Sequence, residues 1–276
     1  MRWLVVLLFL PLVGYTQLYD ISAGVGGAMY AGDLTANTLA SYAHQLNPAA
    51  NVSAAFYFSP AYRVRGYALI AKLSGNDAYS DLDWQRERNL NFESNIQEFG
   101  LQVEADLGRF FNLPPVRSYP YAFIGASVLH FNPLSEFNGR MVALQPLGTE
   151  GQGMPGYDPK YRLMTTAVNF GFGYKYPLMD FVDLVVTAAW RRANTDYLDD
   201  VSKNYVSNAE LAENNGELAS LLGNKIGRET GRTRGGKYSN DWYGVGLISL
   251  RYYFGERRNV MSRHKSGYTG RCPSKF

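Results

Sequence analysis

The 276-residue sequence has one cysteine, three histidines and no internal run of about 18 apolar residues. The missing apolar runs argue against a helical membrane protein. Without a cysteine pair, an HExxH motif or a phosphate-cradling glycine loop, neither metal hydrolysis nor nucleotide binding has support. The formal net charge of +3 is too small to indicate a nucleic-acid partner.

The sequence begins with MRWLVVLLFLPLVGYTQ, which has a basic residue, an apolar stretch and small residues in the order of a secretory signal peptide. We therefore expect a signal peptide at 1–16, a folded domain at 17–254 and a basic C-terminal tail at 255–276. In an exported protein, the odd Cys272 indicates an intermolecular disulfide or a free thiol.

The segment NIQEFGLQVEADLGRF alternates apolar and polar residues at period two. Similar patterns recur along the chain in segments long enough to cross a bilayer, and aromatic residues gather near their ends. The predicted strands are 18–31, 51–59, 62–73, 96–109, 119–131, 162–176, 181–194 and 240–254.

Short and long connections alternate strictly between these strands. This alternation is typical of bacterial outer-membrane barrels, whose periplasmic turns are short and whose external loops are long. Because lipid cannot satisfy an open sheet edge, an even set of strands with one apolar face must close. The sequence therefore predicts an all-β fold, an eight-stranded antiparallel transmembrane barrel of the outer membrane of a Gram-negative cell, with the tail on the periplasmic side.

A barrel of eight strands is too narrow for a water-filled channel, because side chains fill it. Polar residues opposite the apolar face must then meet inside, where charges are tolerated only if they are paired. The expected lumen charge network comprises Glu98, Glu104, Asp106, Lys175, Asp183, Arg191 and Arg251. We interpret it as a structural plug, with an ion or proton path as the alternative.

Several segments, taken in order, resemble the PorG family of outer-membrane barrels from the type IX secretion system of Bacteroidota. They are GGAMYAGDL, NFESNIQEFGLQVEADL, YPYAFIGASVLHFNP, DPKYRLMTTAVNFGFGYKY, RRANTDYLDDVSKNY and GGKYSNDWYGVGLISLRYYF. The combination of FNP, PKY and TDYLDDVS is specific, whereas each piece alone is weak.

The resemblance implies a non-enzymatic component of protein secretion and gliding motility, without a cofactor, that associates with the periplasmic ring proteins PorK and PorN. We expect the tail to dock on such a partner through Arg257, Arg258 and Arg263, with Cys272 as a candidate disulfide anchor. The expected surroundings are outer-membrane lipids and lipopolysaccharide. The alternative is a general small barrel for membrane stabilisation or adhesion.

The stretch TDYLDDVS places Asp196, Asp199 and Asp200 at the start of the last external loop. These carboxylates could bind calcium, but their spacing departs from the EF-hand pattern, so we favour capping of loop amides. Further along, SNAELAENNGELASLL has capping-box spacing and predicts a short helix on the rim, with partner binding as the alternative. The basic stretch GNKIGRETGRTRGGK is interpreted as a solvated loop, with lipid phosphates as an alternative ligand.

A lipid hydrolase would need a nucleophile, a base and an orienting acid within hydrogen-bond reach. Only His130 lies near a predicted membrane rim, and Ser127, three positions away, falls on the opposite face of the strand. We therefore expect a protein without catalytic activity.

Overall fold

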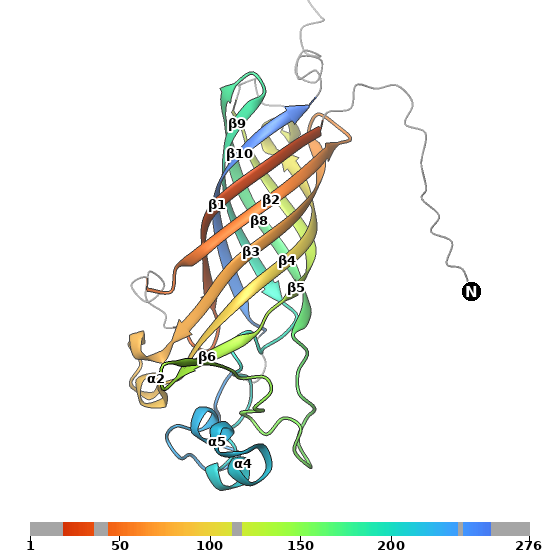
Figure 1. Cartoon of the computed structure of the whole chain (residues 1–276). Coiled ribbons are helices and arrows are strands. Elements are labelled where there is room, and N and C mark those ends of the chain that lie inside the picture. The colour runs from red at the N-terminus through yellow and green to blue at the C-terminus, as the bar shows by residue number, and fades with distance from the viewer. Residues whose placement is uncertain (1–18, 36–43, 112–117, 237–239, 255–276) are drawn as a thin grey trace, which may run out of the picture.

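The computed structural model describes residues 19–35, 44–111, 118–236 and 240–254. Within these ranges, ten strands form one antiparallel sheet, and eight of them form a closed ring (Figure 1). The ring strands are β1 (Tyr19–Ala31), β2 (Asn47–Tyr57), β3 (Tyr62–Asn76), β4 (Asn91–Asp106), β5 (Pro120–His130), β8 (Met164–Met179), β9 (Val182–Ala193) and β10 (Trp242–Phe254). The ring closes because β1 pairs with both β2 and β10 while β3 pairs with β4. The predicted eight-stranded antiparallel barrel is confirmed.

The two remaining strands form a hairpin that the sequence did not predict. β6 (Pro133–Phe137) pairs with the start of β4, and β7 (Arg140–Ala143) pairs with β6. Both are too short for a clear alternation of apolar and polar residues. Several ring strands also differ from their predicted ends: β2 begins at Asn47 rather than at 51, and β4 begins at Asn91 rather than at 96.

The helices of the described residues are short and lie in the connections. They are the 3-10 turn η1 (Asp77–Tyr79), α2 (Asp83–Arg88), α3 (Leu107–Phe110), α4 (Asn208–Asn215) and α5 (Glu217–Gly223). α4 begins as its capping spacing predicts, because the Ser207 hydroxyl accepts a hydrogen bond from the Glu210 amide. Gly216, with φ +92°, separates α4 from α5.

The two ends of the barrel differ. One end carries the short turns at 58–61 and 180–181, and the chain enters and leaves the barrel there, because Tyr19 pairs with Phe254. At the other end the long connections fold together into what we call the loop cap, at the bottom of Figure 1. Its described residues are 32–35, 44–46, 77–90, 131–163, 194–236 and 240–241.

The outer wall of the barrel is apolar. Val25 and Phe99, for example, expose 68% and 67% of their surface, and aromatic residues gather near the short-turn end. On β3, polar residues begin at Lys72, which forms an ion pair with Glu93 on β4. From Tyr62 to Lys72, at about 3.3 Å per residue and a tilt of about 40°, the apolar band spans roughly 25 Å. A band of this height matches the hydrocarbon core that a transmembrane barrel crosses.

The interior has two layers. Towards the cap, the barrel is filled by apolar and aromatic side chains that pack against residues of the cap loops. Members of this core from the barrel include Tyr30, Leu69, Leu73, Phe92, Ile96, Leu129 and Tyr243, and members from the cap include Leu34, Leu198, Val201 and Leu222. Towards the short turns the filling is charged. At the cap end, the strands extend beyond the outer apolar band. Residues of the cap continue the apolar core of the barrel there.

Candidate functional site

Glu104 on β4 is the centre of the charged layer near the short turns. It is fully buried, pairs with Arg63, and accepts a hydrogen bond of 2.6 Å from Nε of Arg65. Arg63 and Arg65 are two positions apart on β3 and therefore point to the same side of the sheet. The guanidinium of Arg63 also lies 4.9 Å from the ring centre of Tyr121.

Asp20 on β1 is the second acid of this layer. Nη1 and Nη2 of Arg65 donate to its two oxygens at 2.8 and 3.0 Å, and the Tyr57 hydroxyl donates at 2.7 Å. Arg251 on β10 lies 3.7 Å from Asp20 and 3.9 Å from Glu104. One buried cluster therefore joins β1, β3, β4 and β10, including the two strands that close the ring.

Two further contacts complete the layer. Lys175 on β8 donates to Asp106 on β4 at 2.6 Å, and the Tyr253 hydroxyl donates to Asp183 on β9 at 2.6 Å. A separate pair lies closer to the cap, where Nε of Arg191 donates to both oxygens of Glu98 at 3.0 and 2.8 Å. The hydroxyls of Tyr67 and Tyr243 also donate to Glu98.

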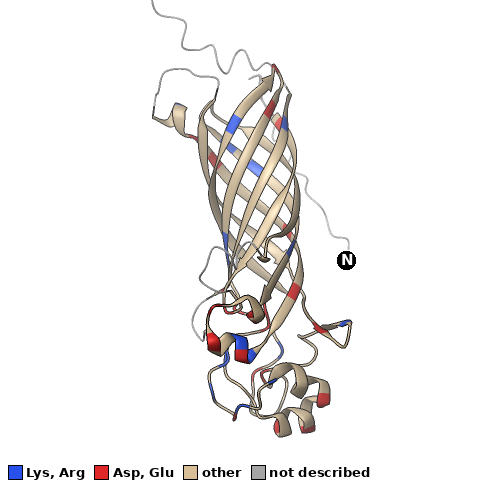
Figure 2. Cartoon of the chain, turned by 90° about the vertical axis from the view of Figure 1, so that its left-hand side faces the viewer, with Lys and Arg blue, Asp and Glu red and all other residues tan. Residues whose placement is uncertain are grey.

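The formal charges of the ionisable side chains inside the barrel sum to zero. The barrel interior holds five basic and five acidic side chains, and all but the partly exposed Lys175 are buried. They are Arg63, Arg65, Lys175, Arg191, Arg251, Asp20, Glu98, Glu104, Asp106 and Asp183. Figure 2 shows acidic and basic bands interspersed along the barrel. All seven predicted lumen residues point inward. The structure adds Asp20, Arg63 and Arg65, and the alternation YRVRG carried the signal for the two arginines.

Two buried arginines hold the loop cap together. Arg88, the last residue of α2, forms a two-oxygen ion pair with Asp77 and donates to the carbonyls of Asp33 and Arg234. Arg234 donates to Glu150 at 2.9 Å and to the carbonyl of Asp200 at 2.7 Å. The interpretation of the basic stretch as a solvated loop is therefore wrong for Arg234, which is 3% exposed.

The acids of TDYLDDVS have different surroundings. Asp199 accepts hydrogen bonds from the Tyr30 hydroxyl and the Val201 amide, and Asp200 accepts from the hydroxyls of Tyr161 and Thr149. Both acids are buried, whereas Asp196 is partly exposed. Asp199 therefore has the predicted role of capping a loop amide. Within the part of the chain that the structure describes, no group of three potential ligand residues could hold a metal ion.

Burial changes the pKa values of these loop acids. It raises the pKa of Asp196 to about 7, and it raises the pKa of Asp200 to about 6 against the opposing effect of Arg234. It also raises the pKa of Asp199, which the neighbouring Asp241 raises further. Protons are therefore bound in the cap at mildly acidic pH.

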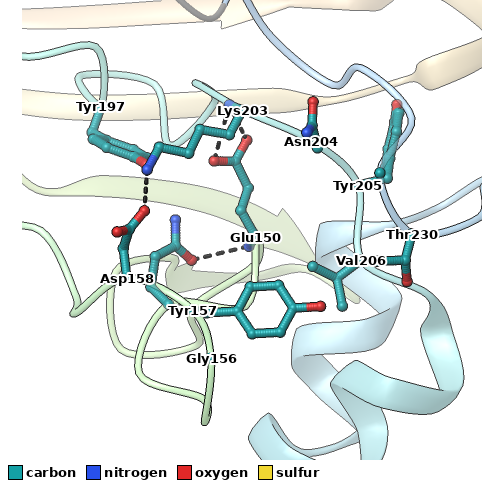
Figure 3. Close-up of a pocket in the computed structure, with 12 residues that line it drawn as sticks. Glu150, Gly156, Tyr157, Asp158, Tyr197, Lys203, Asn204, Tyr205, Val206 and Thr230 are labelled. Carbon is teal, nitrogen blue, oxygen red and sulfur yellow. Dashed lines mark hydrogen bonds and ion pairs between the residues drawn. The ribbon is translucent and has the colours of Figure 1, made fainter.

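A pocket of about 220 Å³ opens on the cap between the loop 150–158, the segment 203–206 and residues 230–231 (Figure 3). Its walls carry three tyrosines, Tyr157, Tyr197 and Tyr205, with acid, amide and hydroxyl groups between them. No residue of this pocket was selected from the sequence, because its lining is assembled from separate loops.

The match to a family model covers residues 1–142, about half of the chain, and the model is described as a domain of unknown function, DUF6089. The chain belongs to the DUF6089 family. This description assigns no function to the family. The match therefore identifies relatives of the chain without assigning an activity. A search of curated proteins finds no match.

Solved structures similar to this DUF6089 chain are outer-membrane barrels. Ail of Yersinia pestis is 11% identical, with 87% of this chain and 100% of that chain covered and a TM-score of 0.38. A major outer membrane protein of Thermus thermophilus is 12% identical, with 87% and 100% covered and a TM-score of 0.40. Neisserial surface protein A is 10% identical, with 86% and 96% covered and a TM-score of 0.37.

The predicted partner-binding residues Cys272, Arg257, Arg258 and Arg263 lie outside the described residues, as does the predicted signal peptide at 1–16. In the described part of the DUF6089 chain, no helix is long and apolar enough to span a membrane. His130 is exposed on the outer face of β5, while Ser127 is buried on the inner face. The alternation predicted for these two residues is confirmed.

Proposed function

We propose that this chain is a non-enzymatic barrel of the outer membrane that anchors periplasmic machinery of type IX secretion. The observation that carries the proposal is the filled interior, with an apolar core under the cap and paired charges towards the short turns. A barrel filled in this way offers little room for solute passage, so we expect it to act through its surfaces.

The outer wall supports placement in a membrane. Large apolar side chains such as Ile70, Leu101 and Ile124 expose more than 60% of their surface around the ring. Exposed apolar area of this extent would drive aggregation in water, whereas a bilayer buries it. The paired charges Lys72 and Glu93 lie where lipid head groups begin in this placement.

The anchoring role is proposed for the short-turn end. The chain leaves the barrel there at Phe254, next to Tyr19, and residues 255–276 follow with a strong excess of basic residues. We place this end in the periplasm, where the tail would dock on the PorK and PorN ring that the PorG-like segments imply. Cys272 would provide a covalent anchor in an oxidising compartment.

The decisive experiment compares cells lacking the protein with cells producing a chain that ends at Gly255. Loss of cargo export, together with loss of ring proteins from the outer-membrane fraction, is expected in both. A Cys272→Ser chain, run on reducing and non-reducing gels, separates covalent from non-covalent docking. Intact export and intact ring association in cells without the protein would refute the proposal.

A second candidate, a barrel for adhesion or membrane stabilisation, is favoured by the folded cap. Buried ion pairs such as Arg234 with Glu150 make this cap a defined surface rather than a set of loose loops. That role predicts that deleting 208–223, the two cap helices, changes surface binding while removing the tail has no effect. The secretion role predicts the opposite pattern.

A further inference from the structure

The pocket on the loop cap contains charged groups that are already neutralised. Glu150 accepts hydrogen bonds from Arg234 and from the backbone amides of Ser202 and Lys203. The Lys203 ammonium forms an ion pair with Asp158 at the mouth, where Figure 3 shows the two side chains pointing toward one another. A charged ligand would therefore have to displace an existing partner, whereas a neutral ligand would not.

A buried polar group without a protein partner lines the same pocket. Oε1 of Gln152 accepts a hydrogen bond of 3.0 Å from the Glu150 amide, and this fixes which end of the side-chain amide is the donor. Nε2 of Gln152 is buried and makes no hydrogen bond of normal geometry, although Tyr197 lies nearby. Buried donors are usually satisfied in native proteins, so this one is available to a ligand or a bound water.

Asn204 contributes a further polar side chain to the wall formed by residues 203–206 (Figure 3). Asn204 forms an isolated backbone bridge to Thr233, which holds the segment in an extended conformation, so the side chains of Asn204 and Tyr205 point to opposite sides. The side chain of Tyr205 is buried in the cap, near Arg234 and Arg88. Amide and hydroxyl groups both donate and accept hydrogen bonds, as the hydroxyls of a neutral ligand require.

The aromatic walls are fixed in position. The Tyr197 ring is stacked on Tyr161 with ring centres 4.5 Å apart, and the Tyr157 hydroxyl donates to Glu210 at 2.6 Å. Rigid tyrosine rings offer flat apolar contact area at low cost in side-chain entropy. A pocket with flat rings and neutral hydrogen-bonding groups is suited to a ligand with one apolar face and a hydroxyl-bearing edge.

From these contacts we propose that the cap pocket binds one neutral sugar unit of a glycan. The sugar ring stacks on a tyrosine, and its hydroxyls bond to Gln152 and Asn204. The volume of about 220 Å³ lies below the roughly 300–1,000 Å³ of pockets for drug-sized ligands, which favours a single sugar residue over a longer bound segment. This inference is independent of the secretion role.

The test uses the purified full chain in detergent micelles and saturation-transfer NMR with methyl glycosides of N-acetylglucosamine, galactose and mannose as separate probes. Transfer to at least one probe is expected. A double variant, Asn204→Ala with Gln152→Leu, should bind that probe about three- to tenfold more weakly, since each change removes one neutral hydrogen bond. Tyr79→Phe, an exposed tyrosine of the same cap away from the pocket, serves as the matched control.

Two results would overturn the proposal. One is the absence of transfer to all three probes from wild-type protein whose barrel is folded by circular dichroism. The other is undiminished transfer in the double variant. Gln152→Leu alone provides a further variant, because it removes the buried donor at the pocket wall while leaving Asn204 in place.

Discussion

The hydroxyl of Tyr30, at the end of β1, lies 2.5 Å from a carboxylate oxygen of Asp241, the residue before β10. The same hydroxyl lies 2.8 Å from Asp199 in the cap. One hydroxyl has one proton and cannot donate to two ionised acids at once. We therefore expect Asp199 and Asp241 to share an additional proton. The hydrogen bonds around Tyr30 then connect the barrel rim to the cap.

The stability of the cap is expected to depend on pH. Burial raises the pKa of Asp200 to about 6 and that of Asp196 to about 7, from 3.8 in the unfolded chain. A raised pKa stabilises the folded state fully below pH 3.8, and this contribution is lost as pH rises through the folded values. Cap peptides within 194–236 should therefore exchange amide hydrogens faster at about pH 8 than at about pH 5, after correction for intrinsic rates.

A variant tests whether the buried pair Asp199 and Asp241 adds to this pH dependence. Asp199→Asn places a neutral amide beside Tyr30 and Asp241 and should reduce the pH dependence of exchange in the cap. Peptides from β4 in the same experiment provide the reference, since they lie within the barrel. Equal pH dependence in wild type and variant would show that this acid pair has no role in the effect.

Removing one lumen acid should strongly destabilise the barrel. Glu104→Gln leaves Arg63 and Arg65 without their shared carboxylate, and breaking a buried pair typically costs about 3–5 kcal/mol. Glu93→Gln breaks an exposed pair with Lys72 on the outer wall and should cost about 1 kcal/mol or less. Urea unfolding of both variants in detergent measures the difference, and similar costs would contradict a structural role for the network.

A third prediction concerns the cap arginine. Arg234→Met should open the cap to proteolysis near 194–236, because it leaves Glu150 buried without its cation and removes a donor to the Gly223 carbonyl. Arg232→Met changes an exposed arginine two residues earlier and is the control. If both variants resist protease as wild type does, the ion pair does not hold the cap.

The filled interior predicts a lack of conductance. In planar bilayers the wild-type protein should show no stable channels, because apolar core residues and paired charges occupy the barrel. A chain lacking 208–223 should also stay closed, since Glu98 and Arg191 remain paired below the cap. Stable single-channel currents from either protein would show that the interior opens.

The barrel could be predicted from the sequence because its signal is local. Alternation at period two places Glu98 and Asp183 inside and Phe99 and Val186 outside, whatever the partner strand. The same alternation is present in YRVRG, so Arg63 and Arg65 follow the same rule, although the predicted network did not include them.

The cap could not be predicted in the same way. Arg88 and Arg234 lie 146 positions apart, yet they share a hydrogen bond. A contact at this separation has no periodic pattern, since it depends on how several loops fold over one barrel mouth. The pocket was missed for the same reason, because its walls come from loops that acquire their neighbours only after folding.

Arg251 also restricts how the barrel can assemble. It lies on the last strand, directly opposite Ser22 on β1, and its charge faces Asp20 and Glu104. A slip of one residue between β1 and β10 would turn every side chain of β10 to the other face and place this guanidinium in lipid. The cost of an unpaired charge in lipid disfavours such a slip, so the arginine fixes which face of β10 turns inward when the ring closes.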